Sequence, residues 1–340
     1  MSPRSFKTGK VPSDVLRRLV FNRLGVPTDR VLSGPGGGED AAVIDMGDRV
    51  LVAKGDPITG AEDNIGWLSV HINANDIAST GAKPLWFVCI ALLPEGADES
   101  MLGGIMDDIH EACLEVGASL VGGHTETTPG LDRPILAGFM MGEAQRDRYV
   151  TTGGAKPGDL IILTKGAGIE GTAVIASDLG GHLKGKVDDQ VVERGAAMVR
   201  WISVVPEAMK AVEAGSPNSL HDPTEGGIIN GLWEMAEAAG VGLRVDRASI
   251  PIPDETRQIC GALGVDPLKL LGSGALLITA QPGEAEKIMG ALTKEGIRAS
   301  VIGEVTPLSD GRLLVDEKGN HEPIEAVQQD EIYRILDELS

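Results

Sequence analysis

At 340 residues the chain is longer than one hydrophobic core usually supports, so we expect two domains, residues 1–150 and 151–340. The formal net charge of −20 argues against binding to nucleic acid or to an acidic membrane surface, because both require a basic face. The longest apolar run, residues 85–93, is too short to cross a bilayer, and the three cysteines form no CxxC pair, so we expect a cytoplasmic protein with reduced thiols.

Helices and strands are predicted to alternate along the first domain. In chain order we expect a helix at 15–24, two strands joined by a turn at 46–48 with the second ending near Asp56, a helix from 64 to 81, a strand at 85–94, a helix at 99–116, and strands at 118–123 and 134–144. The helices carry apolar residues at helical spacing, and the strands are short apolar runs bounded by turn-forming residues.

The second domain follows a turn-rich joint near residue 150. We expect a strand at 160–164, a helix at 172–179, helices through 191–214, a strand and loop at 219–227, a helix at 228–239, and strand–helix–strand units to residue 304. Strands that alternate with helices indicate α/β layers, so the predicted fold class is α/β.

A glycine-rich stretch, GPGGGEDAAVI at residues 34–44, precedes the first predicted hairpin. A Walker-type phosphate loop requires Lys and Ser or Thr after its last glycine, but Glu39 and Asp40 follow here. Carboxylates beside a phosphate repel it unless a divalent cation lies between them. We therefore expect Gly38 and its neighbours to give the backbone the freedom to present Asp40 to a metal ion.

Two more aspartates could join Asp40. Asp56 ends a predicted strand, and Asp76 lies on a polar helical stripe together with Asn73. Carboxylates from several elements suit a Mg²⁺–nucleotide site, although aspartates at such positions also serve as turn formers and helix caps. Asn73 and Asn75 flank Asp76 and could bind phosphate or its waters, or only form part of the polar stripe.

The motif GGHTE at residues 122–126 has a chemical interpretation of its own. Gly122 and Gly123 allow close approach of the backbone to a ligand, and Thr125 can donate to a phosphate. His124 and Glu126 can move a proton near neutral pH, and these two are our candidate catalytic residues. A capping or core-edge imidazole is the structural alternative for His124.

Two further segments have open interpretations. Near the N-terminus, FKTGK offers Lys7 and Lys10 as flexible groups that neutralise phosphate, or it is a solvated basic tail. The segment TKGAGIEG at residues 164–171 is either a second anion-accepting loop at a helix N-terminus or a plain strand-to-helix turn.

Five motifs occur in one order along almost the whole chain: EDAAVI, a strand that ends in Asp, NANDIASTGAKP, GGHTE and HDPTEGG. In this order they resemble the superfamily of aminoimidazole ribonucleotide synthetase, selenophosphate synthetase, thiamine-monophosphate kinase and hydrogenase maturation factor E. The segments around HDPTEGGIINGLWEMAEAAG and ALGVDPLKLLGSGALL are most similar to the hydrogenase maturation factor.

The resemblance implies a fold, cofactors and an activity. The N-terminal sheets of two protomers would form a shared β-barrel in a homodimer, with an α/β C-terminal domain, and ATP with Mg²⁺ would lie between the protomers. Asp40, Asp56 and Asp76 match the metal-binding aspartates of the superfamily, and Asp222 matches a fourth acidic position. A similar GGHT segment in selenophosphate synthetases places His124 in the site.

Two functions follow as hypotheses. The first is an ATP-dependent enzyme that activates an oxygen of a small or protein-borne substrate by phosphorylation, with Mg²⁺ neutralising charge. The second is a non-catalytic nucleotide-binding partner in a metalloenzyme maturation complex. The retained acidic positions favour the first, because a pure scaffold has no need of mutually repelling carboxylates.

The sequence departs from hydrogenase maturation factor E where that family carries its chemistry. That family has a tail ending in Cys, whereas these residues end in LDELS, and the last cysteine is Cys260 in a predicted helix. Glu126 stands where the family has Lys, and Ser273 stands where it has Glu. We expect residues 321–340 to form a docked amphipathic helix, and the chain not to dehydrate a carbamoyl group on its own tail.

Overall fold

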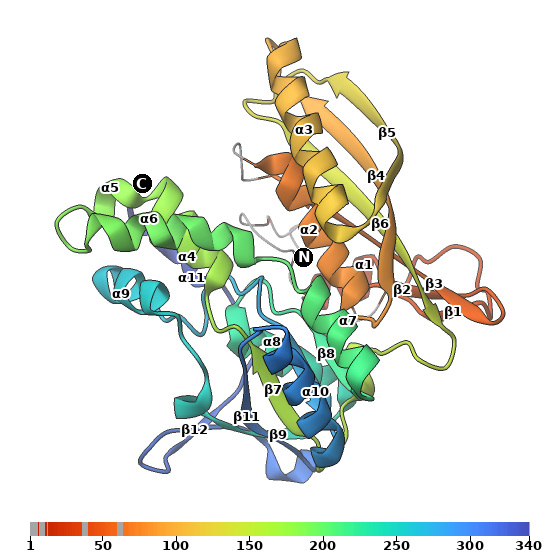
Figure 1. Ribbon diagram of the computed structural model, residues 1–340, viewed down its shortest axis with the longest axis vertical. Coiled ribbons are helices and arrows are strands. Elements are labelled where there is room, and N and C mark those ends of the chain that lie inside the picture. The colour runs from red at the N-terminus through yellow and green to blue at the C-terminus, as the bar shows by residue number, and fades with distance from the viewer. Residues whose placement is uncertain (1–5, 7–10, 12, 36–39, 60–63, 340) are drawn as a thin grey trace.

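The computed structural model describes residues 6, 11, 13–35, 40–59 and 64–339. The candidate ligand-binding residues Lys10 and Gly38 lie outside this part of the chain, as do Lys7 and Glu39. Figure 1 shows two sheets, one in each half of the chain, with helices packed against both. No helix in the described ranges is long and apolar enough to span a membrane.

The first sheet has six strands within the described residues, in the spatial order β1-β2-β3-β6-β4-β5. The strands are β1 Val31–Ser33, β2 Ala42–Asp45, β3 Arg49–Ile58, β4 Lys83–Leu93, β5 Ser119–Thr127 and β6 Ile135–Gln145. β2 and β3 form the hairpin that was predicted to turn at 46–48. β5 runs parallel to β4 and forms one edge of the sheet.

Two helices, α2 Ile65–Ala78 and α3 Glu99–Val116, cover one face of this sheet (Figure 1). α3 has the predicted boundaries because its ends are capped. The Asp98 side chain accepts a hydrogen bond from the Met101 backbone N–H, and Gly117 ends the helix with a left-handed φ of 77°. α2 is buried on most of its surface, since it lies between the sheet, α3 and α7.

The second sheet has seven strands within the described residues, in the order β13-β12-β9-β11-β7-β10-β8. The strands are β7 Leu160–Thr164, β8 Ser219–His221, β9 Gly242–Asp246, β10 Leu277–Ala280, β11 Ala299–Thr306, β12 Arg312–Val315 and β13 His321–Pro323. β7 lies inside the sheet and is covered on both faces. Ile162 joins one apolar cluster, and Ile161 and Leu163 join another, which explains its unbroken apolar sequence.

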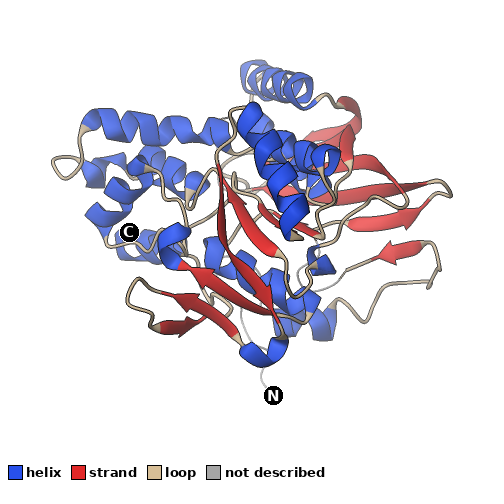
Figure 2. Ribbon diagram, turned by 60° about the horizontal axis from the view of Figure 1, so that its bottom comes forward, coloured by secondary structure: helices blue, strands red, loops and turns tan. Residues whose placement is uncertain are grey.

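The remaining α-helices belong to the second half of the chain, with the exception of α1. They are α1 Ser13–Leu19, α4 Ile169–Asp178, α5 Gly180–Leu183, α6 Asp189–Ala197, α7 Val205–Ala214, α8 Gly227–Ala239, α9 Asp254–Leu263, α10 Pro282–Lys294 and α11 Glu331–Leu339. α4, α6, α9 and α11 share an apolar cluster of their own, and Figure 2 shows the C-terminus beside helices of this group. α11 docks there through Ile332 and Ile335, whereas Leu336 is 37% exposed.

The predicted α/β class is confirmed, and most predicted elements are present. Two boundaries differ in ways that matter below. The first helix ends at Leu19, so the turns that follow it are not helical. β5 continues through Thr127, so the GGHTE motif lies within a strand and not in a loop after it.

The contact between α2 and α3 provides a test of the fold. A Cβ atom added to Gly66 would lie 2.4 Å from the Ile105 carbonyl oxygen and 2.7 Å from the Asp108 Cβ, whereas one added to Gly104, on the exposed side of α3, meets nothing within 4 Å. We expect Gly66→Ala to lower the free energy of unfolding by about 1–3 kcal/mol through overpacking. Gly104→Ala should raise it by about 0.5–1 kcal/mol through helix propensity.

Denaturant unfolding of both variants beside the wild type measures these changes. Equal effects of the two substitutions would contradict the close packing of the helix that carries Asp76.

Candidate functional site

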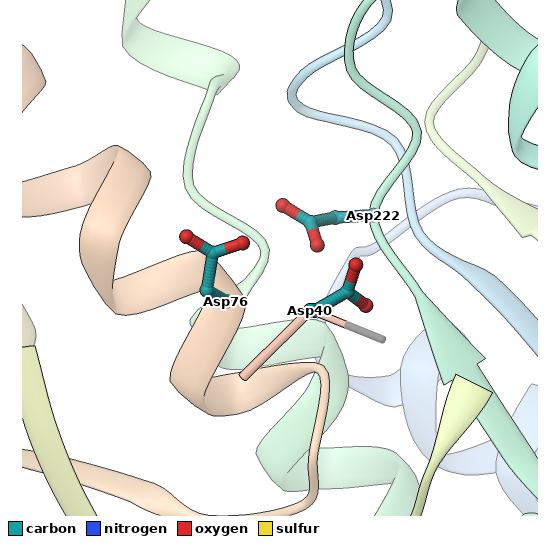
Figure 3. A group of neighbouring side chains, drawn as sticks. All are labelled: Asp40, Asp76 and Asp222. Atoms are coloured by element: carbon teal, nitrogen blue, oxygen red, sulfur yellow. The ribbon is translucent and has the colours of Figure 1, made fainter. Parts of the chain in front are cut away.

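Three aspartates from distant parts of the chain meet between the two sheets. Asp40 precedes β2, Asp76 lies on α2, and Asp222 directly follows β8. One carboxylate oxygen of each lies within 4.8 Å of the others, and Figure 3 shows the three side chains converging. We call Asp40, Asp76 and Asp222 the carboxylate triad. Because Asp222 belongs to the second half of the chain, the triad exists only when the two halves pack together.

Hydroxyl groups orient two members of the triad. Ser79, one turn beyond Asp76 on the same side of α2, donates to Asp222 Oδ1 at 2.9 Å. The Thr152 hydroxyl donates to Asp40 Oδ2 at 3.1 Å. Asp76 Oδ2, by contrast, is buried and has no hydrogen-bond partner among the residues that the structure describes. An unpartnered buried carboxylate oxygen is costly, so this atom marks where a cation would be most stabilising.

His221 links the triad to another carboxylate. Its Nδ1 lies 3.0 Å from Asp40 Oδ2, and its Nε2 lies 3.1 Å from Glu234 Oε2 on α8. Burial opposes protonation of this imidazole, but Asp40 and Glu234 outweigh burial and raise the pKa of His221 well above its usual range. The charged ring therefore donates to both carboxylates and fixes the orientation of Asp40.

Lys54 on β3 is the second cation beside the triad. Its Nζ lies 3.3 Å from Asp76 Oδ1 and 3.4 Å from Asp56 Oδ2. Burial lowers the pKa of Lys54, but the surrounding carboxylates, Asp76 first and then Asp56, outweigh it, so the ammonium keeps its proton more firmly than a free lysine. Asp56 therefore pairs with Lys54 and is not one of the three carboxylates that converge.

The triad holds more negative charge than its neighbours neutralise. Burial, and then the charge of Asp40, raise the pKa of Asp222 to about 7, against the opposing effects of His221, Ser79 and Lys54. Burial also raises the pKa of Asp76 well above its usual range; Lys54 opposes this shift and Asp222 adds to it. Crowded oxygen ligands of this kind fit a hard divalent cation such as Mg²⁺, which would replace the missing positive charge.

The two asparagines beside Asp76 use their amide groups for the protein itself. Asn73 Oδ1 accepts from the Asp56 backbone N–H at 2.8 Å, and Asn73 Nδ2 donates to the carbonyls of Asp56 and Ser69. Asn75 Nδ2 donates to the Ile202 carbonyl and Asn75 Oδ1 accepts from the Val204 N–H, both at 2.8 Å. In this structure Asn73 ties β3 to α2, and Asn75 ties α2 to the second half of the chain.

His124 and Glu126 of the GGHTE motif lie on the other face of the first sheet. The β4–β5 register pairs His124 with Ile90 and Glu126 with Leu92. Ile90 and Leu92 alternate along β4 with residues of the buried face such as Cys89, so the positions paired with them face away from α2. All residues of β5 are exposed, and the His124 Nε2 lies 3.1 Å from Glu126 Oε2. Within one chain, therefore, the candidate catalytic pair and the triad occupy opposite faces of the sheet.

The glycines and threonine of the same motif also have definite positions. A Cβ on Gly123 would lie 2.0 Å from the Cys89 carbonyl oxygen, so its freedom serves close packing on β4. A Cβ on Gly122 would meet nothing within 4 Å. Thr125 pairs with Ala91 and is exposed along the open strand edge. These residues can therefore contact a nucleotide only if it binds at this strand edge or is brought there by a second chain.

Sequence reasoning missed five residues of the site: Lys54, Ser79, Thr152, His221 and Glu234. A signal existed for two of them. Lys54 precedes Asp56 by two residues on a strand, and residues two apart on a strand share a face. His221 directly precedes Asp222 in the HDPTEGG motif. Ser79 and Glu234 become visible only when α2 and α8 are packed.

Comparison with known proteins covers both halves of the chain. Residues 38–144 match the AIR synthase related protein, N-terminal domain, and residues 156–316 match the AIR synthase related protein, C-terminal domain. These matches place Asp40 and Asp76 in the first of the two family domains and Asp222 in the second.

Curated relatives align over most of their lengths. A putative hydrogenase expression/formation protein of Methanocaldococcus jannaschii is 28% identical over 90% of this chain and 91% of its own. Carbamoyl dehydratase HypE of Cupriavidus necator is 30% identical over 82% of this chain and 79% of its own. Selenide, water dikinase of a Geobacter species is 29% identical over 84% of this chain and 88% of its own.

Solved structures share the fold. The structure of a HypE–HypF complex aligns with a TM-score of 0.75 at 22% identity and covers 92% of this chain and 99% of that one. The structure of hydrogenase maturation protein HypE in complex with ATP aligns with a TM-score of 0.70 at 24% identity and covers 93% of both chains. These likenesses confirm the predicted two-domain architecture.

The raised pKa of Asp222 predicts a pH dependence of the metal-free protein. In the unfolded chain an aspartate has a pKa near 3.9, whereas the pKa of Asp222 in the folded protein is about 7. Between these two pH values the folded state therefore binds the proton of the Asp222 carboxyl group more tightly than the unfolded state does. The associated stability is present below the unfolded pKa and is lost as the pH rises through the folded one. Asp222→Asn removes the effect and retains an acceptor for Ser79.

We therefore expect the unfolding free energy of Asp222→Asn, relative to wild type in EDTA, to increase from pH 5 to pH 8 by up to about 1.4 kcal/mol per pH unit. Denaturant unfolding at several pH values measures the difference, in which titratable groups remote from Asp222 cancel. A difference that is constant with pH would show that Asp222 titrates normally.

Proposed function

Because the chain belongs to the AIR synthase related protein family, we propose that it is an ATP-dependent enzyme whose Mg²⁺–nucleotide site is built around the carboxylate triad. The reaction we propose is activation of an oxygen atom, on a small or protein-borne substrate, by phosphoryl transfer. The relatives named carbamoyl dehydratase and selenide, water dikinase support an ATP-dependent reaction. The substrate of this chain is a separate question.

The observation that carries the proposal is the convergence of Asp40, Asp76 and Asp222 from both halves of the chain, with one Asp76 oxygen that finds no partner in the described part of the chain. Buried carboxylates that repel one another lower the stability of the fold unless a cation joins them. A protein that only bound a partner would gain nothing from this arrangement. Phosphoryl transfer, in contrast, requires a metal ion that neutralises phosphate charge.

The chain's own residues would position the reactants. Asp40, Asp76 and Asp222 would hold Mg²⁺, and the ion would supply charge neutralisation at the phosphate oxygens. His221 and Thr152 keep one Asp40 oxygen engaged and so fix its carboxylate plane, and Ser79 does the same for Asp222. Catalysis in such a site rests on positioning and electrostatics, which rigid side-chain partners favour.

The acceptor of the phosphoryl group is proposed to come from outside this chain. Cys89, Cys113 and Cys260 are all buried. Burial raises the pKa of Cys89 and Cys113 to about 11 and that of Cys260 to about 12, so none forms a reactive thiolate near neutral pH. A thiocarbamate on one of these cysteines is therefore not the expected substrate.

A homodimer is the assembly that we propose. β5 leaves one strand edge open, and the face of the sheet away from α2 and α3 carries apolar side chains, including Val88, Ile90 and Phe139. Val121 is 53% and Phe139 is 44% exposed. A second copy packed on this face would cover both features. It would also give His124 and Glu126 a route to a site that they do not reach within their own chain.

The first test is stabilisation by ligand. Mg²⁺–ATP at about a hundred times its dissociation constant should raise the unfolding free energy by roughly 2.7 kcal/mol. Asp76→Asn should remove that increase without lowering the stability of the metal-free protein, because it removes a ligand and a repelling charge together. Asp107→Asn, on the exposed side of α3, is the matched control and should keep the full increase.

Thermal unfolding with and without Mg²⁺–ATP gives the readout. An unchanged melting temperature in the wild type would exclude the proposed nucleotide site, and a metal-free Asp76→Asn protein that fails to fold would assign Asp76 a structural role.

The second test concerns the dimer. Val121→Asp places a charge on the proposed interface and should convert the dimer to a monomer, because a buried unpaired carboxylate opposes association. Leu308→Asp makes the same change at a 57% exposed leucine of the second half and should leave the dimer intact. Light scattering coupled to gel filtration measures the mass. A monomeric wild type, or a dimeric Val121→Asp protein, would contradict this interface.

A further inference from the structure

The two oxygens of Asp76 have different surroundings. Oδ1 lies 3.3 Å from the Lys54 Nζ, while Oδ2 is buried and has no partner within residues 13–35, 40–59 and 64–339. Asp76 belongs to the group whose oxygens lie within 4.8 Å of Asp40 and Asp222 (Figure 3). One carboxylate thus borders two places for positive charge, of which one already holds an ammonium group.

The backbone fixes Lys54 in its place. Side chains two residues apart on a strand point to the same face, so Lys54 follows the fully buried Val50 and Val52 on the face of β3 that packs on α2. Asp56 follows on the same face, and Asn73 clamps its backbone N–H and carbonyl to α2. The β3–β6 register places Lys54 opposite Met140 and Asp56 opposite Gly138, well inside the sheet. The backbone of β3 therefore fixes the position of Lys54 among the carboxylates.

We propose that Lys54 is a built-in cation which permanently occupies the position between Asp56 and Asp76, so that the metal-binding group of this chain takes a single divalent cation, at Asp40, Asp76 and Asp222. This inference rests on the function proposed above. Asp56 then serves as the partner of Lys54 and not as a metal ligand. A lysine supplies charge without open coordination positions, which reduces the number of ions that the site requires.

The same geometry leaves Lys54 able to contact a ligand. An ammonium group has three N–H donors, of which one donates to Asp76 Oδ1 at 3.3 Å and a second can serve the ion pair with Asp56, whose Oδ2 lies 3.4 Å from the Nζ. The third remains for an anionic oxygen beside the triad. A phosphate bound to the divalent cation would carry such an oxygen, so Lys54 and the cation would hold one phosphate from two sides.

The experiment counts divalent cations per chain. Wild type, Lys54→Met, Lys54→Arg and Lys83→Met are titrated with Mn²⁺ in nucleotide-free buffer, and free Mn²⁺ is measured by electron paramagnetic resonance. We expect one ion per chain in the wild type and two in Lys54→Met, because removing the ammonium frees Asp56 and one Asp76 oxygen. Lys54→Arg keeps the charge, and Lys83→Met changes an exposed lysine at the start of β4, so both should bind one ion.

Affinity gives a second readout from the same titration. Removing the neighbouring ammonium should tighten the first Mn²⁺ by at least about tenfold, since like charges no longer repel, whereas Lys54→Arg should leave this affinity within about twofold of the wild type. Circular dichroism and gel filtration check that Lys54→Met is folded. If Lys54→Met does not fold, the number of ions bound by the wild type still tests the proposal.

The outcomes separate this inference from the proposed function. Two ions in the wild type, or an unchanged count in folded Lys54→Met, would overturn the role of Lys54 and leave the Mg²⁺–ATP site standing. No Mn²⁺ binding by any of the four proteins, together with no stabilisation by Mg²⁺–ATP, would overturn the proposed function and this inference with it.

Discussion

Mutual repulsion among buried carboxylates is the constraint on which the rest of the site depends. Asp40 and Asp76 come from the first half of the chain and Asp222 from the second, so packing the two halves together brings like charges into contact. Lys54, paired with Asp76, and the protonated His221, paired with Asp40, offset part of this repulsion. The remainder favours binding of a further cation, and we expect such binding to stabilise the packing of the two halves against each other.

Hydrogen bonds across the same boundary hold the carboxylates at close range despite their repulsion. Asn75 binds both sides of the backbone at Ile202 and Val204, and Ser79 donates to Asp222. Asn75 lies on α2 next to Asp76, and Ser79 directly follows the last residue of this helix, so one buried helix and its C-cap carry a metal-ligand candidate together with the groups that fix its distance from the second sheet. This gives the extensive burial of α2 a functional reason, since a helix that could rotate would not hold a site between two domains.

The first sheet serves two different surfaces. Its inner face packs on α2 and leads through Lys54 and Asp56 to the triad, whereas its outer face and the β5 edge carry exposed apolar groups beside His124 and Glu126. The alternation of a β-strand assigns neighbouring residues to one surface or the other. The function proposed for the GGHTE motif therefore depends on association of two copies of the chain. The function proposed for the triad depends only on the folding of one chain and on its ligand.

Short-range patterns in the sequence determined the α/β class, the hairpin at 46–48, the helix at 99–116 and the candidacy of Asp40, Asp56 and Asp76, because periodicity, caps and residue type are properties of a few neighbouring residues. Asp222 became a candidate only through the resemblance of its HDPTEGG motif to the superfamily. The tertiary structure alone decided that Lys54 reaches Asp76, that His221 bridges Asp40 and Glu234, and that Asn73 and Asn75 bind backbone. It also placed His124 on the face opposite the triad. These outcomes join residues up to 181 positions apart, and no local window of sequence contains the packing that brings such side chains within hydrogen-bonding distance.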